Sequence, residues 1–506
     1  MSQQDTPIEE TFKAVESHPH LAFLKDLRGR LPGAEWFLVG GAVRDIVLGR
    51  MTERQDFDLV VRGVDLDAVA SVLGEMGKVD YVGRDFGVLK FMPETATKGA
   101  PAVDIAWPRT ESAGGSGRYS DFRVQSDPDL PMIDDLSRRD FTANAMAWDF
   151  ARQELLDPFD GMGDLKARLI RAVREPNERF SEDLSRMLRA IRFACELGFV
   201  IEPNTWDALE RHAKQIAGTR LLDDGIEERL VPYETVAREF AKALRADAAK
   251  AVELLERSGL LFRIVPELER MSRTPQSSEW HSEGDVWTHS KLALAKATGP
   301  EFGNFFPDDR LAVETMFAIL LHDVGKPEMM TEKDGKVSFY GHDSQGAKMA
   351  RSIAERLRLS SVPGIRIRPE RIEWLVRNHL FPIFVDLEHV RKTTLCRYFL
   401  KDIEAGRALL HVAFADLSAS EPEAGVADPS RLHDLMKEIE TLEQESEKAK
   451  EQACDLSGRE VMEETGLAPG PEIGRLLEEL REAQLSGEVS SEADARTFLK
   501  RLVERG

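Results

Sequence analysis

Apolar and polar positions divide this chain into two parts with different periodicity. From Trp36 to about Trp148, short apolar runs with strand-like patterning alternate with short helical pieces such as 67–76. From Leu165 onward, helical spacing dominates almost to the end, as in the apolar face of 184–191. We therefore predict an α/β head with a small mixed sheet, followed by domains that are mostly helical.

Segments rich in proline, glycine and serine mark domain boundaries and a loop along the chain. At 506 residues the chain is too long for a single core, and several domains are expected. Polar segments at 275–279 and 420–425 mark two boundaries, and 111–131, with three glycines and two prolines, is expected to be a mobile loop. The predicted domains are a lead-in at 1–30, a head at 31–164, a neck at 165–275, a further helical domain at 280–420 and a tail at 430–506.

Composition changes this picture mainly through charge. The formal net charge is -22, which argues against simple electrostatic binding of nucleic acid. Two local stretches are nevertheless basic, at 166–192 and 366–401, although solvated helix faces explain the second equally well. The three cysteines are far apart, the N-terminus is polar, and the longest apolar run (312–321) is too short to span a bilayer, so we expect a cytoplasmic protein without membrane contact.

The most informative segment joins a glycine pair to two carboxylates. Gly41 and Arg44 lie in the run FLVGGAVRD, where glycine lets backbone approach phosphate oxygens and arginine adds charge. Asp56 and Asp58 follow at alternate positions of an apolar strand, so both side chains project from one face. Such a pair can hold two Mg²⁺ ions for attack at phosphorus. The alternative is a glycine turn followed by a strand with one solvated face.

Two further motifs carry charge suited to nucleotides. In RRDFTANA, Arg139 can bind phosphate and Asp140 can accept from ribose hydroxyls. In EDLSR, we expect Ser181 to cap a helix whose first turn holds Asp183, placing Asp183 and Arg186 on one face. Two more arginines, Arg189 and Arg192, continue that face, although standing alone the motif could be an ordinary salt bridge.

A separate set of histidines and aspartates lies between 289 and 416. A helical His-Asp pair with further histidines and a distant aspartate resembles the HD phosphohydrolase family, and these residue types suit a divalent metal of unknown identity. The candidate ligands are His289, His322, Asp323 and Asp416, with His342 and His379 as further members.

Taken together, these motifs resemble the bacterial tRNA nucleotidyltransferase and poly(A) polymerase family, above all its class II CCA-adding enzymes. The resemblance rests on GGAVRD, DFDLVV, RRDFTANA, DPFDGMGDLKARLIRAV, EDLSRMLRAIRFACELGF and the histidine set, and the tail from 455 to 474 resembles the part that binds the tRNA elbow. It implies addition of CCA to tRNA 3′ ends from CTP and ATP, with two Mg²⁺ ions at the head.

The resemblance also implies roles for individual residues. Asp56 and Asp58 would hold the metals, Gly41 and Arg44 would contact the triphosphate, and Arg139 with Asp140 would contact the ribose. Asp183, Arg186, Arg189 and Arg192 would form the nucleotide-binding and base-selecting face. A carboxylate and a guanidinium suit the amine and acceptor shared by cytosine and adenine, while uracil and guanine would leave a buried acceptor unpaired.

Several alternatives remain open at this point. The chain could add only CC, only A, or poly(A), and the loop at 111–131 is expected to be needed for the final A. It could also be mainly an HD phosphohydrolase with an RNA-binding head, or a nucleotidyltransferase that modifies protein. The intact Asp56 and Asp58 weigh against a pure binding module, and the tail weighs against a protein substrate.

Overall fold

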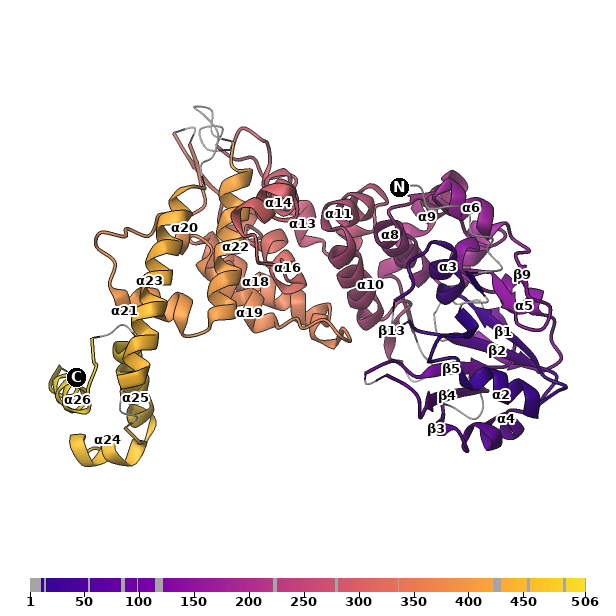
Figure 1. Ribbon diagram of the computed structural model, residues 1–506. Coiled ribbons are helices and arrows are strands. Elements are labelled where there is room, and N and C mark those ends of the chain that lie inside the picture. Colours follow the sequence, from indigo (N-terminus) through magenta and orange to yellow (C-terminus); the bar gives the residue numbers. More distant parts are fainter. Residues whose placement is uncertain are drawn as a thin grey trace. The chain divides into compact units, whose positions relative to one another are not determined.

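The computed structural model describes residues 11–12, 15–52, 55–82, 87–97, 99–113, 122–221, 225–277, 281–334, 336–421, 429–452, 456–485 and 488–505. The chain forms two compact units: Met1–Ala246 with Glu253–Ile264, and Asp247–Val252 with Val265–Gly506 (Figure 1). Helix α11 (Ala248–Arg257) contributes residues to both units. The bounds of the five domains drawn from the sequence stay predictions.

A seven-stranded mixed sheet forms the head of the first unit, with the strand order β3-β4-β5-β2-β1-β8-β9. Strand β2 runs parallel to β5 and antiparallel to β1, and the other neighbours are antiparallel. The strands are β1 (Glu35–Val39), β2 (Asp58–Arg62), β3 (Gly77–Tyr81), β4 (Val88–Pro93), β5 (Val103–Ala106), β8 (Ala147–Asp149) and β9 (Glu154–Leu156). The apolar runs of the sequence therefore became the sheet, and the predicted mixed α/β head is confirmed.

Short helices surround this sheet (Figure 1). Helix α5 packs on one face, where Phe37, Val39 and Val60 join Met132 and Leu136 in a buried cluster. Because the central strands are buried on both faces, their apolar runs are nearly continuous. The helices of the head are α2 (Phe23–Arg30), α3 (Gly41–Val47), α4 (Leu66–Leu73), α5 (Met132–Ser137), α6 (Gly161–Ala167) and the short 3₁₀ helix η2 (Thr142–Asn144).

The segment expected to be a loop between 111 and 131 contains strand structure. Strands β6 (Arg109–Ala113) and β7 (Phe122–Ser126) pair antiparallel as a hairpin, and α5 begins at Met132. Its glycines, at 114, 115 and 117, lie outside the described residues, so the loop prediction is wrong for the flanks. Alternation of apolar and polar residues is visible only in β7, where Phe122 and Val124 alternate with polar residues, and β6 is almost entirely polar.

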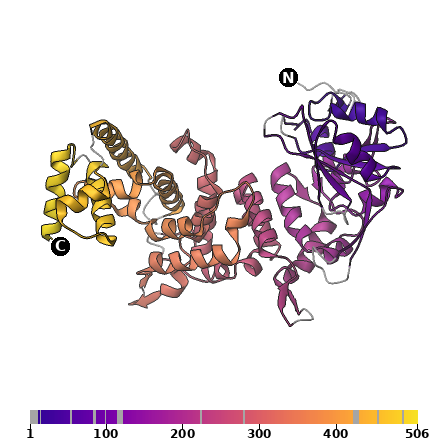
Figure 2. The ribbon, with the colours of Figure 1, turned by 90° about the horizontal axis from the view of Figure 1, so that it is seen from below.

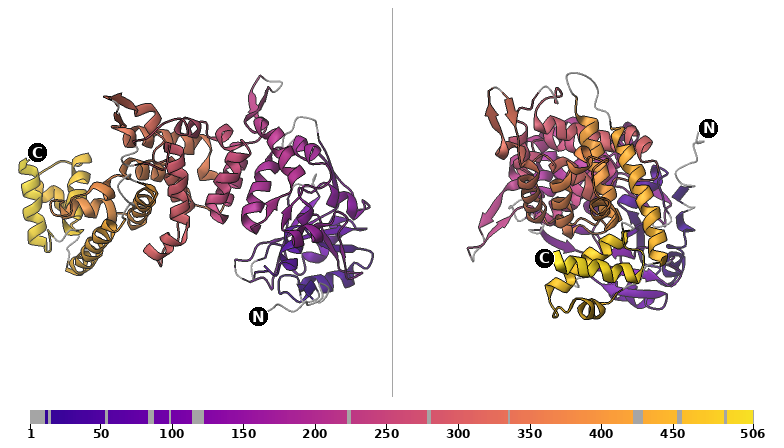
Figure 3. Two further views of the ribbon diagram at one scale, coloured as in Figure 1. Left: turned by 90° about the horizontal axis from the view of Figure 1, so that it is seen from above. Right: turned by 90° about the vertical axis from the view of Figure 1, so that its left-hand side faces the viewer.

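The helical part of the first unit follows the head. A second hairpin, β12 (Thr219–Leu221) with β13 (Glu227–Arg229), projects from it in Figures 2 and 3. Strands β10 (Leu169–Ile170) and β11 (Val200–Ile201) pair in parallel on either side of α7 and α8. The helices are α7 (Pro176–Glu182), α8 (Ser185–Leu197), α9 (Pro203–His212), η3 (Ala213–Ala217), α10 (Tyr233–Ala246) and α12 (Leu261–Ile264).

The helix expected to open at Glu182 is broken at that point. Ser181 and Glu182 lie in the last turn of α7, and α8 begins only at Ser185, so the predicted Ser181 cap is wrong. Asp183 between them is extended (φ -142°, ψ 102°), and its Oδ1 accepts from the Ser185 backbone nitrogen at 2.8 Å. An aspartate with this local hydrogen bond competes with helix continuation, which explains the break.

The second unit is helical, with one small hairpin formed by β14 (Thr331–Lys333) and β15 (Lys336–Ser338). Helices α14, α16, α18, α19 and α22 pack against one another as its core. Its helices are α13 (Glu267–Met271), α14 (Val286–Thr298), α15 (Pro300–Phe305), α16 (Val313–Leu321), α17 (Lys326–Met329), α18 (His342–Arg356), η4 (Leu359–Ser361), α19 (Pro369–Asn378), α20 (Phe381–Phe384), α21 (Lys392–Leu395), the π-helix η5 (Cys396–Leu400), α22 (Ile403–Ala419), α23 (Arg431–Gln452), α24 (Gly458–Thr465), α25 (Pro471–Leu485) and α26 (Glu492–Arg505).

The tail has an apolar core of its own. Val461, Leu476, Leu480 and Leu499 are buried together, and a capping box of Ser457 and Glu460 begins α24. Within the described residues, none of the helices combines the length and apolar character needed to cross a bilayer. The predicted helical character of the region after the head is confirmed.

Candidate functional site

Three carboxylates meet at one end of the central strands of the head. Parallel pairing of β2 and β5 places Asp58 opposite Asp104. Asp56 lies two residues before Asp58, and the intervening Phe57 is fully buried on the opposite face. Asp104 was not singled out from the sequence, where it is one polar residue in the run AVDIAW. Its alternation with buried Val103 and Ile105 is the signal that marks its face.

The electrostatics of this cluster favour a bound cation. Burial above all, together with the charges of Asp56 and Asp104, raises the pKa of Asp58 to about 6, although Arg139 and Lys90 oppose the rise. The pKa of Asp56 is also raised, by burial and by Asp104. Lys90 of β4 offers one counter-charge, with its Nζ 2.8 Å from Asp104 Oδ1. Carboxylates that repel one another on rigid strands form the donor set that Mg²⁺ prefers.

Gly40, the first of the two glycines, lies against this cluster. Its φ is +71°, and a Cβ there would lie 2.9 Å from Arg139 Nη1 and 3.5 Å from Asp58 Oδ2. With φ +71° and ψ -136°, Gly40 has a backbone conformation that residues with a Cβ rarely adopt, and Arg139 would have to shift to make room for a Cβ. The predicted residue Gly41 begins α3 one position later, so the close approach belongs to Gly40 and the helix start to Gly41.

Arg44, predicted to contact a triphosphate, is buried and engaged. Its guanidinium donates to both carboxylate oxygens of Asp45 and, through Nη1, to Asn144 Oδ1 at 2.8 Å. It also lies over the Phe193 ring, 5.2 Å from the centroid. Arg44 thus links α3 to RRDFTANA and to α8, and the predicted triphosphate contact stays a prediction.

Asp140 is the centre of a buried hydrogen-bond network. Its Oδ1 accepts from the Phe141 backbone nitrogen at 2.8 Å and from Asn144, and its Oδ2 accepts from Arg189 Nε at 2.8 Å and Nη2 at 2.5 Å. Although burial opposes it, the arginine and the hydrogen bonds lower the pKa of Asp140 to about 2. A ribose contact by Asp140 would have to compete with these partners, and it stays a prediction.

Arg139, the neighbour of Asp140, is bound by a different carboxylate. Its Nη2 lies 3.0 Å from Oδ2 of Asp135, a fully buried carboxylate that also binds Arg138. Because Arg139 also faces Gly40 and Asp58, it lies at the carboxylate cluster with its guanidinium oriented. This position suits contact with a nucleotide phosphate or ribose.

The predicted base-selecting residues lie along the start of α8. Asp183 is 5% exposed, and burial raises its pKa. Arg186 donates to Glu182 Oε2 at 2.9 Å and to the Arg138 carbonyl, while Arg192 is paired with Glu239 and Glu196 at 2.5 and 2.7 Å. The structure brings Asp183, Arg186 and Arg189 beside RRDFTANA, but it turns Arg192 toward α10. A nucleotide contact by Arg192 would therefore compete with two carboxylates.

The second basic stretch is extensively paired with acids of the same unit. Arg368 binds Glu314 at 2.7 Å, Arg371 binds Asp402 at 2.5 Å and Lys392 binds Glu445 at 2.6 Å. Arg397 and Lys401 pair with Glu482 and Glu478 of α25. These contacts favour the interpretation of this stretch as structural helix faces.

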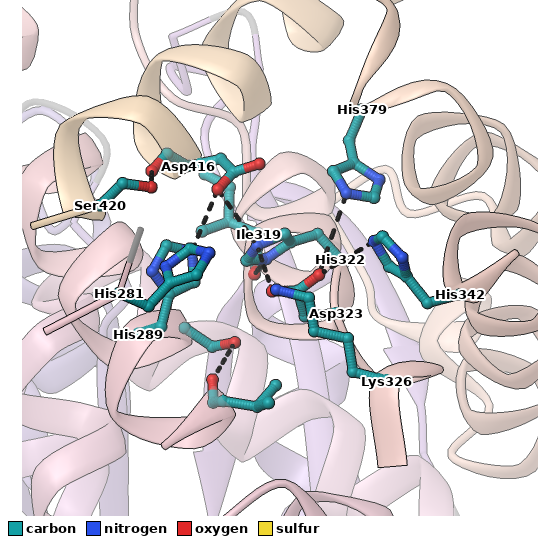
Figure 4. A network of polar contacts seen from close by, with 12 residues as sticks. His281, His289, Ile319, His322, Asp323, Lys326, His342, His379, Asp416 and Ser420 are labelled. Carbon is teal, nitrogen blue, oxygen red and sulfur yellow. Dashed lines mark hydrogen bonds and ion pairs between the residues drawn. The ribbon is translucent and has the colours of Figure 1, made fainter. Parts of the chain in front are cut away.

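A second cluster, which we call the HD cluster, gathers in the second unit. Five helices position it: His289 lies in α14, His322 and Asp323 directly follow α16, His342 begins α18, His379 directly follows α19 and Asp416 lies in α22. Figure 4 shows His322 and Asp323 in the middle, with His289 and Asp416 on one side and His342 and His379 on the other. All six predicted residues therefore come together.

The ligand atoms of the HD cluster form two groups. His289, His322 and Asp416 place ligand atoms within 4.8 Å of one another, and so do Asp323, His342 and His379. Asp323 Oδ2 lies 3.2 Å from His322 Nε2 and its Oδ1 lies 3.3 Å from His342 Nε2, so this carboxylate faces both groups. Lys326 Nζ lies 2.7 Å from the same Oδ2.

Hydrogen bonds orient the histidines of the HD cluster toward its centre. Nδ1 of His322, His342 and His379 lies 2.7 to 2.9 Å from the carbonyl oxygen three residues earlier. Their buried Nε2 atoms face the carboxylate of Asp323, at 3.2, 3.3 and 3.9 Å, but none makes a well-directed hydrogen bond within the part of the chain that the structure describes. Such inward, unsatisfied nitrogens with fixed tautomers fit a divalent metal ion.

The charges of the HD cluster support the same assignment. Burial above all lowers the pKa of His379 to about 4, so the lone pair of its Nε2 is available to a metal ion. Despite burial, His289 and His322 hold the pKa of Asp416 well below its usual range, and His322 and Lys326 do the same for Asp323. Despite burial, hydrogen bonds to carboxylates raise the pKa of His289 to about 9 and also raise that of His342, so a metal ion would have to displace protons from these two rings. Imidazoles beside ionised carboxylates form a suitable donor set once those protons are released.

Comparisons with known proteins agree with this arrangement. Residues 36–171 match the poly A polymerase head domain, and 290–405 match the HD domain. The chain is 33% identical to an A-adding tRNA nucleotidyltransferase of Deinococcus radiodurans over 94% of its own length and 96% of that protein. It is 36% identical to a multifunctional CCA protein of Halorhodospira halophila over 64% of its own length and 69% of the relative.

A solved structure shares the fold. The CCA-adding enzyme of Bacillus stearothermophilus, crystallised with CTP, aligns over 99% of this chain and 98% of its own, with a TM-score of 0.57 and 22% identity. The alignment includes both the head and the helical part. On its sequence relatives and its head domain, the chain belongs to the family of tRNA nucleotidyltransferases and poly(A) polymerases.

Proposed function

We propose that this chain adds CCA to tRNA 3′ ends, using CTP and ATP and releasing pyrophosphate. The convergence of Asp56, Asp58 and Asp104 beside Gly40 and Arg139 carries the proposal. The reaction is attack of a 3′-hydroxyl on the α-phosphate of the nucleotide, and rigid carboxylates next to a phosphate-binding arginine suit it. The relatives named above, which act on tRNA or add CCA, support this substrate class. A cytoplasmic location would follow from that substrate.

The family generally depends on a divalent metal ion. We assign two Mg²⁺ ions to the head, with Asp56, Asp58 and Asp104 as ligands; when bound, the ions supply charge for the attacking and leaving oxygens. Arg139 would bind the nucleotide, and the absence of a side chain at Gly40 would let its phosphates approach. Lys90 would have to leave Asp104 as the carboxylate becomes a ligand.

Asp183 and Arg186 would select the base of the incoming nucleotide. Asp183 would accept from the exocyclic amine shared by cytosine and adenine, and Arg186 would donate to the ring acceptor. Arg189 and Asp140 would act mainly by fixing the start of α8 against RRDFTANA. A carbonyl in place of the amine would face a buried carboxylate, at a cost of about 1–3 kcal/mol.

A second candidate is addition of the terminal A alone. It is favoured because the relative that matches nearly the whole chain is named an A-adding enzyme. The test is incubation with tRNA lacking CCA and with tRNA ending in CC, supplied with CTP alone, ATP alone or both. Full CCA addition predicts that CTP extends the first tRNA by two residues. Extension only of the CC-ending tRNA, and only by ATP, would establish the alternative.

For the HD cluster we propose a divalent-metal site of a phosphohydrolase. Its two ligand groups can accommodate two ions with Asp323 between them, and Lys326 lies where it can contact an anionic substrate. The metal is expected to be one that favours imidazole, such as Ni²⁺, Zn²⁺ or Fe²⁺. Metal content after dialysis, compared between the unmodified protein and His322→Ala, tests the assignment.

A further inference from the structure

One buried carboxylate near the HD cluster has no role in the ligand set described so far. Glu283 lies just before α14, and its side chain is 3% exposed. Its Oε1 lies 2.7 Å from His289 Nδ1 and 2.8 Å from His281 Nδ1, and its Oε2 accepts from the Glu421 backbone nitrogen at 3.1 Å. Both oxygens are therefore used, and one of them contacts a predicted ligand.

The way His289 is held differs from that of its neighbours in the HD cluster. His322, His342 and His379 each have Nδ1 at a backbone carbonyl, whereas Nδ1 of His289 faces a carboxylate. On the other side of the ring, Nε2 lies 3.0 Å from Asp416 Oδ1. With Nδ1–H directed to Glu283, Nε2 is the ring nitrogen left to bind an ion, once the proton that it donates to Asp416 here is displaced.

We propose that Glu283 is a positioning residue for the HD metal site, holding His289 in the metal-binding tautomer and raising the basicity of its Nε2. A carboxylate does this more strongly than a neutral carbonyl, because it stabilises positive charge on the ring when Nε2 binds a cation. Glu283 acts through His289 and does not itself bind the ion. This inference rests on the proposed metal site.

A different role for Glu283 would be as a ligand in a further cation site, since His281, Glu283 and His289 also place donor atoms within 4.8 Å of one another. The geometry argues against it. The separations from Oε1, 2.7 and 2.8 Å, are shorter than the 3.0 Å between His289 Nε2 and Asp416 Oδ1, and this single oxygen already serves both histidines as hydrogen-bond acceptor. His289 would also have to turn its Nδ1 lone pair toward Glu283 and so give up the tautomer that presents Nε2.

The test is a Ni²⁺ titration of the full chain in excess Mg²⁺, which occupies the carboxylate site of the head. Glu283→Leu removes the acceptor and should weaken Ni²⁺ binding by about 10- to 100-fold. Glu283→Gln keeps an acceptor for Nδ1–H but loses the charge, so its Ni²⁺ affinity should lie between those of Glu283→Leu and the unmodified protein. The ligand-field spectrum of bound Co²⁺ should shift in the same order, because the donor strength of His289 changes.

A matched control separates positioning from general loss of stability. Glu314 is another buried carboxylate of the same unit, and it pairs with Arg368 instead of a histidine. Glu314→Gln should lower the melting temperature and leave Ni²⁺ affinity and the Co²⁺ spectrum unchanged. Equal Ni²⁺ affinity of Glu283→Gln, Glu283→Leu and the unmodified protein would overturn the inference.

If Glu283→Leu does not fold, Glu283→Gln decides alone: unchanged affinity together with an unchanged spectrum overturns the proposal. Failure of the unmodified protein to bind Ni²⁺ has a different meaning. It would remove the proposed metal site itself, before any variant is compared.

Discussion

Replacing Asp140 by Asn should destabilise the junction between RRDFTANA and α8 by about 2 kcal/mol. The pKa of Asp140 is lowered from 3.8 to about 2, and 1.8 pKa units at 1.36 kcal/mol each correspond to about 2.4 kcal/mol. The side chain of Arg189, the partner of Asp140, is 32% exposed and can partly rehydrate once the carboxylate is lost. We therefore expect a cost below the 3–5 kcal/mol typical of breaking a fully buried pair.

The assay is hydrogen exchange of peptides from α8 and from 139–145, measured in the full chain. Exchange reports local opening, which suits a protein of two units that need not unfold in one step. A loss of about 2 kcal/mol accelerates exchange by about 30-fold if local opening breaks the Asp140–Arg189 contact. Arg189→Met should have a similar effect, and the double variant should be less than additive because both changes remove one interaction.

The same reasoning fixes the pH dependence. Because the pKa of Asp140 is depressed in the folded state, its stabilising contribution is present above about pH 4 and is lost as the pH falls toward 2. At pH 3 about half of it should remain, so the difference between Asp140→Asn and the unmodified protein should shrink there. A variant with normal exchange but a raised KM for CTP and ATP would refute the argument, and it would support the ribose contact instead.

Three further predictions concern the proposed reactions. Asp104→Asn should reduce nucleotide addition by about 100-fold or more, as Asp56→Ala and Asp58→Ala should, with the fold retained by circular dichroism; near-normal kcat would remove Asp104 from the metal site. Asp183→Ala should lower the preference for CTP and ATP over UTP and GTP more than it lowers kcat with CTP, and equal losses for all four nucleotides would contradict base selection. His322→Ala or Asp323→Ala should abolish metal binding at the HD cluster while CCA addition continues, and parallel loss of both would argue that the two sites are coupled.

Local pattern predicted much of the fold because it depends on features visible within one segment, whereas the HD cluster was predicted from the order of its histidines and aspartates, which resembles a known family. The run FLVGG and the pair Asp56 and Asp58 show strand alternation directly, and each HD residue lies at or near a helix end. Asp104 was missed because its importance depends on which strand lies beside β2. That neighbour is set by long-range packing, and an isolated aspartate in an apolar strand is otherwise typical of a solvated position.

Side-chain partners far apart in sequence were also beyond prediction. Arg192 and Arg189 occupy the same helix and were expected to have the same role. One binds Glu239 of α10, and the other binds Asp140 of the head motif. Glu283 was missed for a different reason: its partners His281 and His289 are close in sequence, but nothing in the local pattern shows that its side chain turns back to them. The sequence lists the charges but not the pairs that neutralise them.

The basic residues of η5 and its neighbour Lys401 allow a final prediction about RNA. Arg397 and Lys401 pair with Glu482 and Glu478, so they hold helix α25 of the tail against η5. If this is their role, Arg397→Ala with Lys401→Ala should speed hydrogen exchange in α25 and leave the salt dependence of tRNA binding unchanged. A residue that contacts phosphate contributes about one unit to the slope of log K against log salt concentration, so two such contacts would lower the slope by about 2. A slope reduced in this way would place the RNA on this surface despite the ion pairs. If the slope is unchanged and hydrogen exchange in α25 is faster, tRNA binds to a different surface of this acidic chain.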